Sequence, residues 1–509
     1  MKILDCTIRD GGYYTNWDFN KELVVTYIKA FNELPVDYLE IGYRSKKMSG
    51  YHGEYFYCPD YVIKEIRHLS TKKLGVMLNE KDVQINDLEN LLGSIKGLID
   101  LVRIAVTPSN FKRSLELARS IKKMGFEVGI NVMYMSKWEE EKNFIEEIEG
   151  VEEVADYFYM VDSYGGVYPE DIEKIYKLVR SKSSVPIGFH GHNNLEMALI
   201  NTLTAIDNGV AIVDATITGM GRGAGNLKTE LLLTSLNAKG KIELNFNKLS
   251  MIVDPFSKMM EEFNWGTNLP YMVSGANSLP QKDVMEWVFK RFYSFNSIIT
   301  ALSNKSKGLK DNLELKDFYP NFESEKVLII GGGPSGAAHS EAIGKFLDFN
   351  SDVTVIHSSS KNVIHSNNIT NRQIHCLAGN EGHRLESIFE NVTSGNRMAI
   401  LPPYPRSMGT YLPSFFKDNV FQLKEVSVTN EFKDSVTAIA IETALTLNAK
   451  EIYIIGYDGY NDSVSSNEVE LFNENENLFL KLKNLNVEFL SLVPTKYKSL
   501  PTSSIYSLV

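Results

Sequence analysis

The sequence predicts an α/β protein: a (β/α)8 TIM barrel followed by a helical segment and a C-terminal Rossmann-like α/β domain. Three observations favour this fold class. The first half repeats a short apolar stretch, a polar turn and an amphipathic stretch, the pattern of parallel strands joined by helices. Eight such repeats fill roughly 240 residues, which is the number that closes a barrel. A second series of apolar strands begins before a glycine-rich turn at Gly331.

The expected barrel strands are short runs rich in Val, Ile, Leu and Tyr. They are Ile3–Ile8, Tyr38–Gly42, Leu74–Leu78, Leu101–Val106, Glu127–Met133, Tyr157–Val161, Ile187–His190 and Ile212–Thr218. An open doubly wound sheet is the alternative, but it usually has fewer repeats and a glycine-rich turn after its first strand. Here the first strand leads into Thr7-Ile-Arg-Asp-Gly11-Gly12 instead.

The length of 509 residues is too great for one hydrophobic core. We expect a TIM-barrel domain at 1–245, a helical extension and linker at 246–318, with Ser303–Lys316 as the linker, and a Rossmann-like domain at 319–509.

Composition excludes several classes of protein. A net charge of −11 gives no basic face for nucleic acid, so an anionic substrate must be held by local cations. Three scattered cysteines are too few for a disulfide framework and indicate a reducing compartment. No apolar run reaches the roughly 18 residues of a membrane span, and the N-terminus has no signal-peptide pattern. We therefore expect a cytoplasmic protein with no membrane or nucleic-acid partner.

A metal site is predicted at the rim of the barrel. In an extended strand, His190 and His192 lie on one face. Closure brings the ends of strands 1, 7 and 8 together, so Asp10 and Asn226 join the two histidines. A carboxylate, two imidazoles and an amide oxygen suit a divalent cation, with Mn²⁺ or Mg²⁺ favoured and Co²⁺ or Zn²⁺ as alternatives.

Three separated motifs at three strand ends carry a family resemblance. They are Leu4-Asp-x-Thr-x-Arg9-Asp10-Gly11, Phe189-His190-x-His192-Asn193 and Gly221-x-Gly-Ala-Gly-Asn226. Together they resemble the DRE-TIM metallolyase superfamily, and within it the 4-hydroxy-2-oxovalerate aldolases, over about residues 1 to 290. The resemblance implies that Asp10, His190 and His192 bind the metal, with Asn226 as a candidate fourth ligand. It also implies that Arg9 stabilises the enolate of a 2-oxo acid such as pyruvate.

The proton carrier is where the sequence departs from that family. The aldolase pattern has a histidine three residues after the metal-binding aspartate, and this chain has Tyr13 followed by Tyr14. Either tyrosine or a metal-bound water is our candidate. Asp162 and Ser163 match an Asp-Thr-Tyr-Gly turn of the family and are candidates for substrate contact, although an Asp-Ser cap on the next helix is an equally good interpretation.

Further substrate contacts are expected from cations and an amide. Arg44, with Lys46 and Lys47, lies on the loop after the second strand, Arg103 lies on the fourth strand and Asn193 follows the histidine pair. Solvated surface charges are the alternative for the loop cations. The helical segment after residue 246 resembles the family's dimer-forming or partner-binding region, so we expect a homodimer.

The C-terminal part contains Gly331, Gly333, Ser335 and Gly336 in a G-x-G-x-x-G spacing, which brings backbone N–H groups to a phosphate. NAD or FAD is disfavoured because the next strand ends at His357 rather than at an acidic residue. Residues 322–509 resemble, more weakly, a family of 6-hydroxymethylpterin diphosphokinase-like proteins and bacterial sialyltransferases. That resemblance implies a nucleotide or nucleotide-sugar site with Asp458 as a metal or ribose contact; a fold kept only for assembly is the alternative.

The function expected from these features is a metal-dependent carbon–carbon lyase, a class II-type aldolase that acts through the enolate of a 2-oxo acid. Its acceptor would be a sugar-derived carbonyl compound. A Claisen-type acyl-CoA-dependent transferase of the same superfamily is one alternative, and a barrel without chemistry that serves as a binding or scaffold protein is another.

Overall fold

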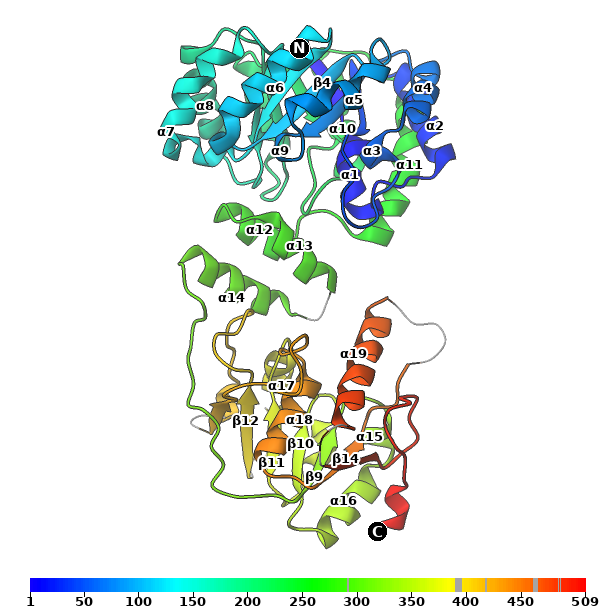
Figure 1. Cartoon of the computed structure of the whole chain (residues 1–509), viewed down its shortest axis with the longest axis vertical. Helices are drawn as coiled ribbons and strands as arrows, with labels where there is room; N and C mark the ends of the chain where they lie inside the picture. The colour runs from blue at the N-terminus through cyan, green and yellow to red at the C-terminus, as the bar shows by residue number, and fades with distance from the viewer. Residues whose placement is uncertain (291–292, 390–395, 417–418, 461–465, 484, 486) are drawn as a thin grey trace. The chain divides into compact units, whose positions relative to one another are not determined.

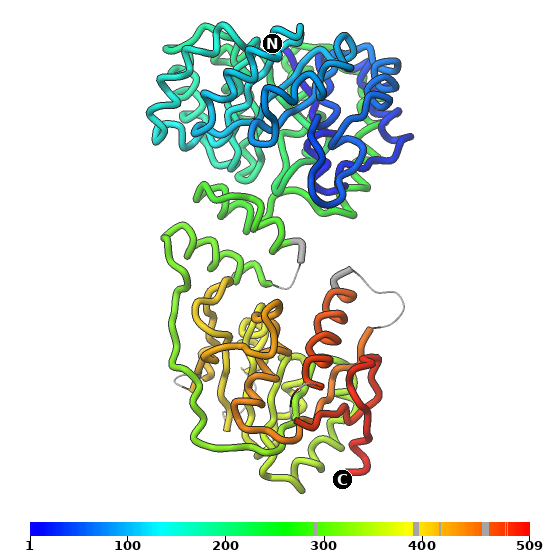
Figure 2. Tube along the Cα trace, in the orientation of Figure 1, coloured from blue at the N-terminus to red at the C-terminus, as the bar shows by residue number. Residues whose placement is uncertain are grey.

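The computed structural model describes the chain except for residues 291–292, 390–395, 417–418, 461–465, 484 and 486. It consists of two compact units, Met1–Met285 and Glu286–Val509. The first runs from blue to green in Figures 1 and 2, and the second from green to red. The three-part division expected from the sequence stays a prediction.

Eight parallel strands of the first unit close into a barrel (Figure 1). They are β1 (Lys2–Asp5), β2 (Tyr38–Tyr43), β3 (Lys73–Asn79), β4 (Leu101–Val106), β5 (Glu127–Val132), β6 (Tyr157–Asp162), β7 (Ile187–Gly191) and β8 (Ile212–Ala215). The last strand pairs with the first, with Lys2 opposite Ile212 and Asp5 opposite Ala215. The predicted barrel is therefore confirmed.

Helices connect the strands of the barrel, and further helices continue the chain after β8, the last of them across the boundary at Met285. They are α1 (Thr7–Thr15), α2 (Lys21–Asn32), α3 (Glu54–Tyr57), α4 (Asp60–Leu69), α5 (Leu88–Leu92), α6 (Phe111–Lys123), α7 (Lys142–Glu147), α8 (Pro169–Lys182), α9 (Ala198–Asp207), α10 (Thr229–Ala238), α11 (Phe246–Phe263), α12 (Leu269–Ala276) and α13 (Gln281–Lys290). Helix α8 illustrates their sequence logic. Pro169 occupies its first position, Tyr168 and Asp171 form a capping box, and Ile172, Ile175 and Val179 make its buried stripe.

The first strand is shorter than the sequence suggests. Strand β1 ends at Asp5 rather than Ile8, because the Asp5 carboxylate accepts hydrogen bonds from the backbone N–H and hydroxyl of Thr7 and turns the chain into α1. Gly11 and Gly12 are helical, and a Cβ on them would lie 2.5 Å from Met220 and 2.1 Å from Trp17. Arg9 and Asp10 therefore lie on a short helix and not at a strand end.

The second unit contains a parallel sheet of seven described strands in the order β13-β12-β11-β10-β9-β14-β15. The strands are β9 (Lys326–Ile330), β10 (Thr354–His357), β11 (Gln373–Cys376), β12 (Arg397–Leu401), β13 (Val420–Gln422), β14 (Glu451–Ile455) and β15 (Glu488–Ser491). The helices are α14 (Phe295–Ser306), α15 (Ser335–Ala338), α16 (Ser340–Phe349), α17 (Glu381–Phe389), α18 (Val436–Thr446) and α19 (Ser466–Leu482).

Alternate side chains of β9 enter two cores. Val327 and Ile329 pack with residues of α18 and α19, whereas Leu328 and Ile330 pack with residues of α16. Because strand side chains alternate, these helices cover opposite faces of the sheet. In the described residues no helix has both the length and the apolar character needed to cross a membrane.

The segment expected as a linker, Ser303–Lys316, is helical at its start, and a buried ion pair holds its later part. Helix α14 extends to Ser306. The buried Asp311 accepts a hydrogen bond from the backbone N–H of Arg406 at 2.9 Å and pairs with its Nε at 3.0 Å. A buried ion pair therefore fixes this segment within the second unit, and its assignment as a linker stays a prediction.

Candidate metal centre at the barrel mouth

Two histidine rings meet edge to face at the end of β7, with ring centres 5.0 Å apart. The Nδ1 atom of His190 lies 2.8 Å from Oδ2 of Asp214, and that of His192 lies 2.8 Å from the carbonyl oxygen of Asp162. An imidazole that donates through Nδ1 keeps a lone pair on Nε2, the form that binds metals. Burial is the largest cause that lowers the pKa of His192, to about 4, so its ring is neutral at pH 7.

Asp10 and Asn226 complete the cluster. One ligand atom from each of Asp10, His190 and His192 lies within 4.8 Å of the others. The Asn226 Nδ2 donates to Asp10 Oδ2 at 2.5 Å, while its buried Oδ1 has no hydrogen-bond partner among the described residues. Burial raises the pKa of Asp10, but Arg9 and the two imidazoles lower it by more. The pKa therefore lies below its ordinary value, and the carboxylate is ionised. An orphaned amide oxygen beside a carboxylate and two imidazoles fits a divalent cation.

Arg9 is fixed beside this cluster. Its Nη1 donates to Asp10 Oδ1 at 2.5 Å and its Nε donates to Glu40 Oε2 at 2.7 Å. The Trp17 indole N–H donates to the Arg9 carbonyl oxygen at 2.9 Å. Burial lowers the pKa of Arg9, but Asp10 and Glu40 raise it above its ordinary value, so the guanidinium keeps its charge.

Glu40 and Asp214 are buried carboxylates of this site that the sequence did not lead us to predict. Both are buried, and both pair with Arg103, which lies 3.3 Å from Glu40 Oε1 and contacts Asp214 Oδ2. Asp214 in turn holds His190. The available signal was a charged residue inside each of two apolar strands, Tyr-Leu-Glu-Ile-Gly-Tyr and Ile-Val-Asp-Ala.

A cavity opens above the cluster, and Tyr13 and Tyr14 behave differently toward it. Tyr13 lines the cavity with Tyr43, and their hydroxyl oxygens are 3.4 Å apart. The Tyr14 hydroxyl instead donates to the carbonyl oxygen of Gly223 at 2.9 Å, and burial raises its pKa above the ordinary value. Of the two candidate proton carriers, Tyr13 is the one that borders the cavity.

Comparisons with known proteins agree with this geometry. The HMGL-like family profile matches residues 103–254. A 4-hydroxy-2-oxovalerate aldolase of Carboxydothermus hydrogenoformans is 31% identical over 245 residues, which cover 47% of this chain and 71% of that protein. The chain belongs to the HMGL-like family. An oxaloacetate decarboxylase of Mycobacterium tuberculosis is 29% identical over 248 residues and is likewise covered to 71%.

A solved structure is also similar to the N-terminal part. The N-terminal domain of a Bacteroides vulgatus protein described as a candidate aldolase is 56% identical, with a TM-score of 0.57; the alignment covers 59% of this chain and all of that one. As a member of the HMGL-like family, the barrel is that of a carbon–carbon lyase that uses a divalent metal.

The other predicted contacts near this HMGL-like centre differ in their placement. Ser163 lines the cavity. Asp162 is buried, and its carboxylate accepts from the N–H groups of Gly166 and Val167 at 3.2 and 3.4 Å, while burial raises its pKa to about 6. Asn193 is not among the described residues that line the cavity, and its Oδ1 accepts from the N–H of Ala198. Asp162 and Asn193 therefore shape turns in this structure.

Arg44 and Arg103 are not brought to the cavity either. Arg44 donates to the carbonyl oxygens of Leu91 and Cys58 at 2.6 and 2.7 Å and pairs with Asp60 at 2.6 Å. Arg103 is fully buried beneath the centre, where it pairs with carboxylates. Neither is one of the described residues of the cavity wall, and each guanidinium is paired with a carboxylate within the barrel unit.

In the second unit, the glycine-rich turn lies against the loop that contains Gly456 and Asp458. Gly331 and Gly333 approach Gly456, and the Asp458 carboxylate accepts from the Ser335 hydroxyl at 2.9 Å. A Cβ on Gly333 would lie 2.0 Å from Asp458 Oδ2. A carboxylate therefore lies against the turn that would receive a phosphate, and the two negative charges would repel each other.

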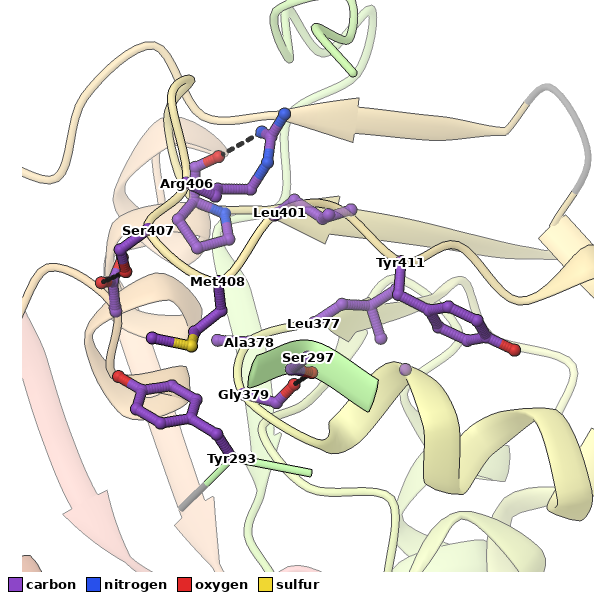
Figure 3. Close-up of a pocket in the computed structure, with 14 residues that line it drawn as sticks. Tyr293, Ser297, Leu377, Ala378, Gly379, Leu401, Arg406, Ser407, Met408 and Tyr411 are labelled. Carbon is purple, nitrogen blue, oxygen red and sulfur yellow. Dashed lines mark hydrogen bonds between the residues drawn. The ribbon is translucent and has the colours of Figure 1, made fainter. Parts of the chain in front are cut away.

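A separate cavity of this unit lies at the carboxyl ends of β11 and β12, two strands from that turn (Figure 3). Leu377–Gly379 and the loop around Arg406 and Met408 line it. Arg406 donates to the Pro402 carbonyl oxygen and the Thr410 hydroxyl at 2.9 and 2.6 Å. Its guanidinium is thus engaged in holding the loop.

Proposed function

We propose that the barrel makes or breaks a carbon–carbon bond through the enolate of a pyruvate-like 2-oxo acid. The observation that carries this proposal is the convergence of Asp10, His190 and His192 next to Arg9, a guanidinium fixed by two carboxylates. Asp10, His190 and His192 would hold the divalent cation, with Asn226 as the fourth ligand. When bound, the cation supplies Lewis acidity to the carbonyl and carboxylate oxygens of the substrate. The mixed nitrogen and oxygen donors favour Mn²⁺ or Mg²⁺.

Arg9 supplies the second positive charge. Enolate formation places negative charge on an oxygen, and a preorganised cation in a buried site stabilises that charge more in the transition state than in the ground state. Glu40 holds the Arg9 Nε at 2.7 Å, and Arg103 holds Glu40, so the fork does not need to reorient during the reaction.

Tyr13 is the proposed proton carrier at the acceptor. In bond formation its hydroxyl gives a proton to the oxygen of the acceptor carbonyl, and in cleavage it takes that proton back. The neighbouring Tyr43 hydroxyl, 3.4 Å away, can relay the proton.

The test is pyruvate release. Protein stripped of metal with a chelator and then reloaded with Mg²⁺ or Mn²⁺ is incubated with 4-hydroxy-2-oxovalerate, and pyruvate is measured with lactate dehydrogenase. We expect metal-dependent release that His192→Ala abolishes, while His68→Ala, at an exposed position on α4, retains it. Metal-independent release, or equal activity of the two variants, would contradict the proposal.

Decarboxylation is a second candidate function, and the oxaloacetate decarboxylase relative favours it. Loss of CO2 from oxaloacetate leaves the same enolate, so the same residues would serve both reactions. Measuring pyruvate release from oxaloacetate in parallel decides between them. We expect the hydroxy-oxo acid to be preferred, because Tyr13 gives the site a group that can exchange a proton with a hydroxyl.

Cytoplasmic location, a homodimer and a nucleotide or nucleotide-sugar site in the second unit remain proposals. The last is weakened by the Asp458 carboxylate against the glycine-rich turn. A location and an oligomeric state are each open to direct measurement on the full chain.

A further inference from the structure

Two arginines line the cavity at the barrel mouth, Arg9 and Arg222. Arg9 is paired with two carboxylates. Arg222 is only partly exposed, and its guanidinium has no carboxylate partner among the described residues; the contact it makes is with the ring of Tyr13, 5.3 Å from the ring centre. In a chain of net charge −11, an unpaired arginine in the wall of a reaction cavity is poised to bind an anion.

We infer that Arg222 binds an anionic group of the acceptor, so that the preferred acceptor is an aldehyde bearing a carboxylate or a phosphate. This inference rests on the proposed aldol function and names the substrate class of that site. The guanidinium would hold two oxygens of the anion in its planar fork while the aldehyde carbon faces the enolate.

The position of Arg222 supports an acceptor contact. Its neighbour Gly221 packs against the metal-ligand cluster, where a Cβ would lie 2.3 Å from Asn226 Nδ2 and 3.2 Å from Asp10 Oδ2. Arg222 therefore starts beside the centre, and its guanidinium lies over Tyr13, the residue proposed to exchange a proton with the acceptor oxygen.

The turn that carries Arg222 is held in one conformation. Gly223 and Gly225 have φ values of +65° and +78°, in the left-handed region that favours glycine. The Tyr14 hydroxyl donates to the Gly223 carbonyl oxygen at 2.9 Å, and a Cβ on Gly223 would lie 2.6 Å from Gln281 Oε1. Tyr14 and Gln281 thus brace the turn from outside, which fixes the backbone of Arg222.

The alternative role for Arg222 is to bind the carboxylate of the 2-oxo acid itself. The two roles separate experimentally, because exchange of the donor's methyl protons requires no acceptor. A residue that binds the acceptor anion affects addition to anionic aldehydes and leaves this exchange unchanged.

The experiment compares matched aldehydes with pyruvate as the donor. Glyceraldehyde 3-phosphate is paired with glyceraldehyde, and succinic semialdehyde with butyraldehyde, in the metal-loaded wild-type protein, Arg222→Ala and Arg222→Lys. Arg119→Ala, which removes an exposed arginine from α6, controls for net charge. Circular dichroism and thermal unfolding confirm that each variant is folded.

We expect wild type to prefer the anionic member of at least one pair. Arg222→Ala should lower kcat/KM for that aldehyde by about 10- to 100-fold, the usual loss for a charged hydrogen bond, with a much smaller change for the neutral partner. Arg222→Lys should recover part of the loss. Inorganic phosphate should compete with the acceptor in wild type and not in Arg222→Ala. The two pairs show whether carboxylate or phosphate is preferred.

Equal losses for anionic and neutral aldehydes, or a wild-type preference for neutral ones, would overturn the inference. Slower methyl exchange or a higher KM for pyruvate in Arg222→Ala would assign the residue to the donor and also overturn it. If wild type itself exchanges no methyl protons with any 2-oxo acid, the proposed function fails first, and the two failures are thereby distinguished.

Discussion

At the residue scale, the two histidines of the proposed metal centre and Arg9 are each held in place by a neighbouring buried group. His190 depends on Asp214, His192 on the carbonyl oxygen of Asp162, and Arg9 on Glu40. These supports are buried, so they have few alternative arrangements. Substitutions of the supports should therefore reduce catalysis without removing a ligand.

Glu40→Gln tests this dependence. The amide keeps the shape of the side chain but removes a charge from between Arg9 and Arg103, so Arg9 loses its fixed position. We expect pyruvate release to fall by about 10- to 100-fold with little change in metal affinity. The matched control is Glu80→Gln, another buried carboxylate that pairs with Arg113. A full loss of metal binding in Glu40→Gln, or the same fall in both variants, would contradict the prediction.

The tyrosine pair offers a second test at this scale. Tyr13→Phe removes the hydroxyl that borders the cavity and should slow carbon–carbon bond cleavage by about 100-fold. Tyr14→Phe removes a hydroxyl that bonds to Gly223 and Tyr271 outside the cavity wall, so we expect a loss of about 1 kcal/mol in the free energy of unfolding and a small change in rate. Steady-state kinetics and chemical denaturation measure both effects. The interpretation fails if Tyr14→Phe is the slower enzyme.

Sequence reasoning succeeded for side chains governed by simple periodicity. His190 and His192, two residues apart at the end of β7, both reach the cluster, and barrel closure brings Asp10 and Asn226 to them. It did not predict that Arg103 pairs beneath the site or that Glu40 joins two arginines. Such pairing depends on which side chains meet inside the closed barrel. In the sequence alone, each charged residue within an apolar strand has no identifiable partner.

At the element scale, strand existence was easier to predict than strand length. Strand β1 stops at Asp5 because its carboxylate accepts from the N–H of Thr7 and turns the chain into α1, and β8 stops at Ala215 rather than Thr218. The short strands β11 and β13 were not expected, because runs of four and three residues carry too little periodicity to be recognised.

Strands β10 and β11 carry a buried histidine pair that predicts acid sensitivity. The rings of His357 and His375 stack with centroids 4.6 Å apart, and His375 also contacts Arg397. Burial lowers the pKa of His357 to about 4 and that of His375 well below its ordinary value. Unfolded histidines take up protons as the pH falls through about 6.5, whereas the buried rings stay neutral. The folded state of the second unit therefore keeps its full stability above that pH and loses stability below it.

Between pH 6.5 and pH 5 we expect each histidine to cost the second unit about 2 kcal/mol. Hydrogen exchange, corrected for its intrinsic pH dependence, should therefore become faster in peptides from β10 and β11 than in peptides from β4 and β5, which serve as an internal control. Uniform acceleration across both groups would argue against the histidine pair as the cause.

At the scale of the whole molecule, the chain joins an HMGL-like barrel to a second parallel α/β unit. The family match and the ligand cluster both fall in the barrel. The fold class of both parts followed from repeated strand and helix patterns, whereas a role for the second unit did not follow from its glycine-rich turn. A G-x-G-x-x-G spacing does not predict whether a carboxylate from elsewhere in the sequence lies against the turn. Asp458, which follows β14, does so here.

Metal binding should stabilise the full chain. A cation present at 1,000 times its dissociation constant contributes about 4 kcal/mol to the free energy of unfolding if it binds only the folded protein. We expect the thermal midpoint of chelator-treated protein to rise on addition of Mn²⁺ or Mg²⁺, and that of Asp10→Asn to respond far less. Asp18→Asn, at a position on the loop after α1, should respond as wild type does. An identical rise in Asp10→Asn would locate the stabilising cation elsewhere.

The central claim is that this metal centre forms the enolate of a 2-oxo acid, and the most direct measurement is exchange of the pyruvate methyl protons in D2O. The loss of the methyl signal is followed by proton NMR with Mg²⁺-loaded protein, chelator-treated protein and His190→Ala. Exchange that requires both Mg²⁺ and His190 is the predicted result. The absence of exchange from every 2-oxo acid offered to the metal-loaded protein, or undiminished exchange in His190→Ala, would contradict the claim.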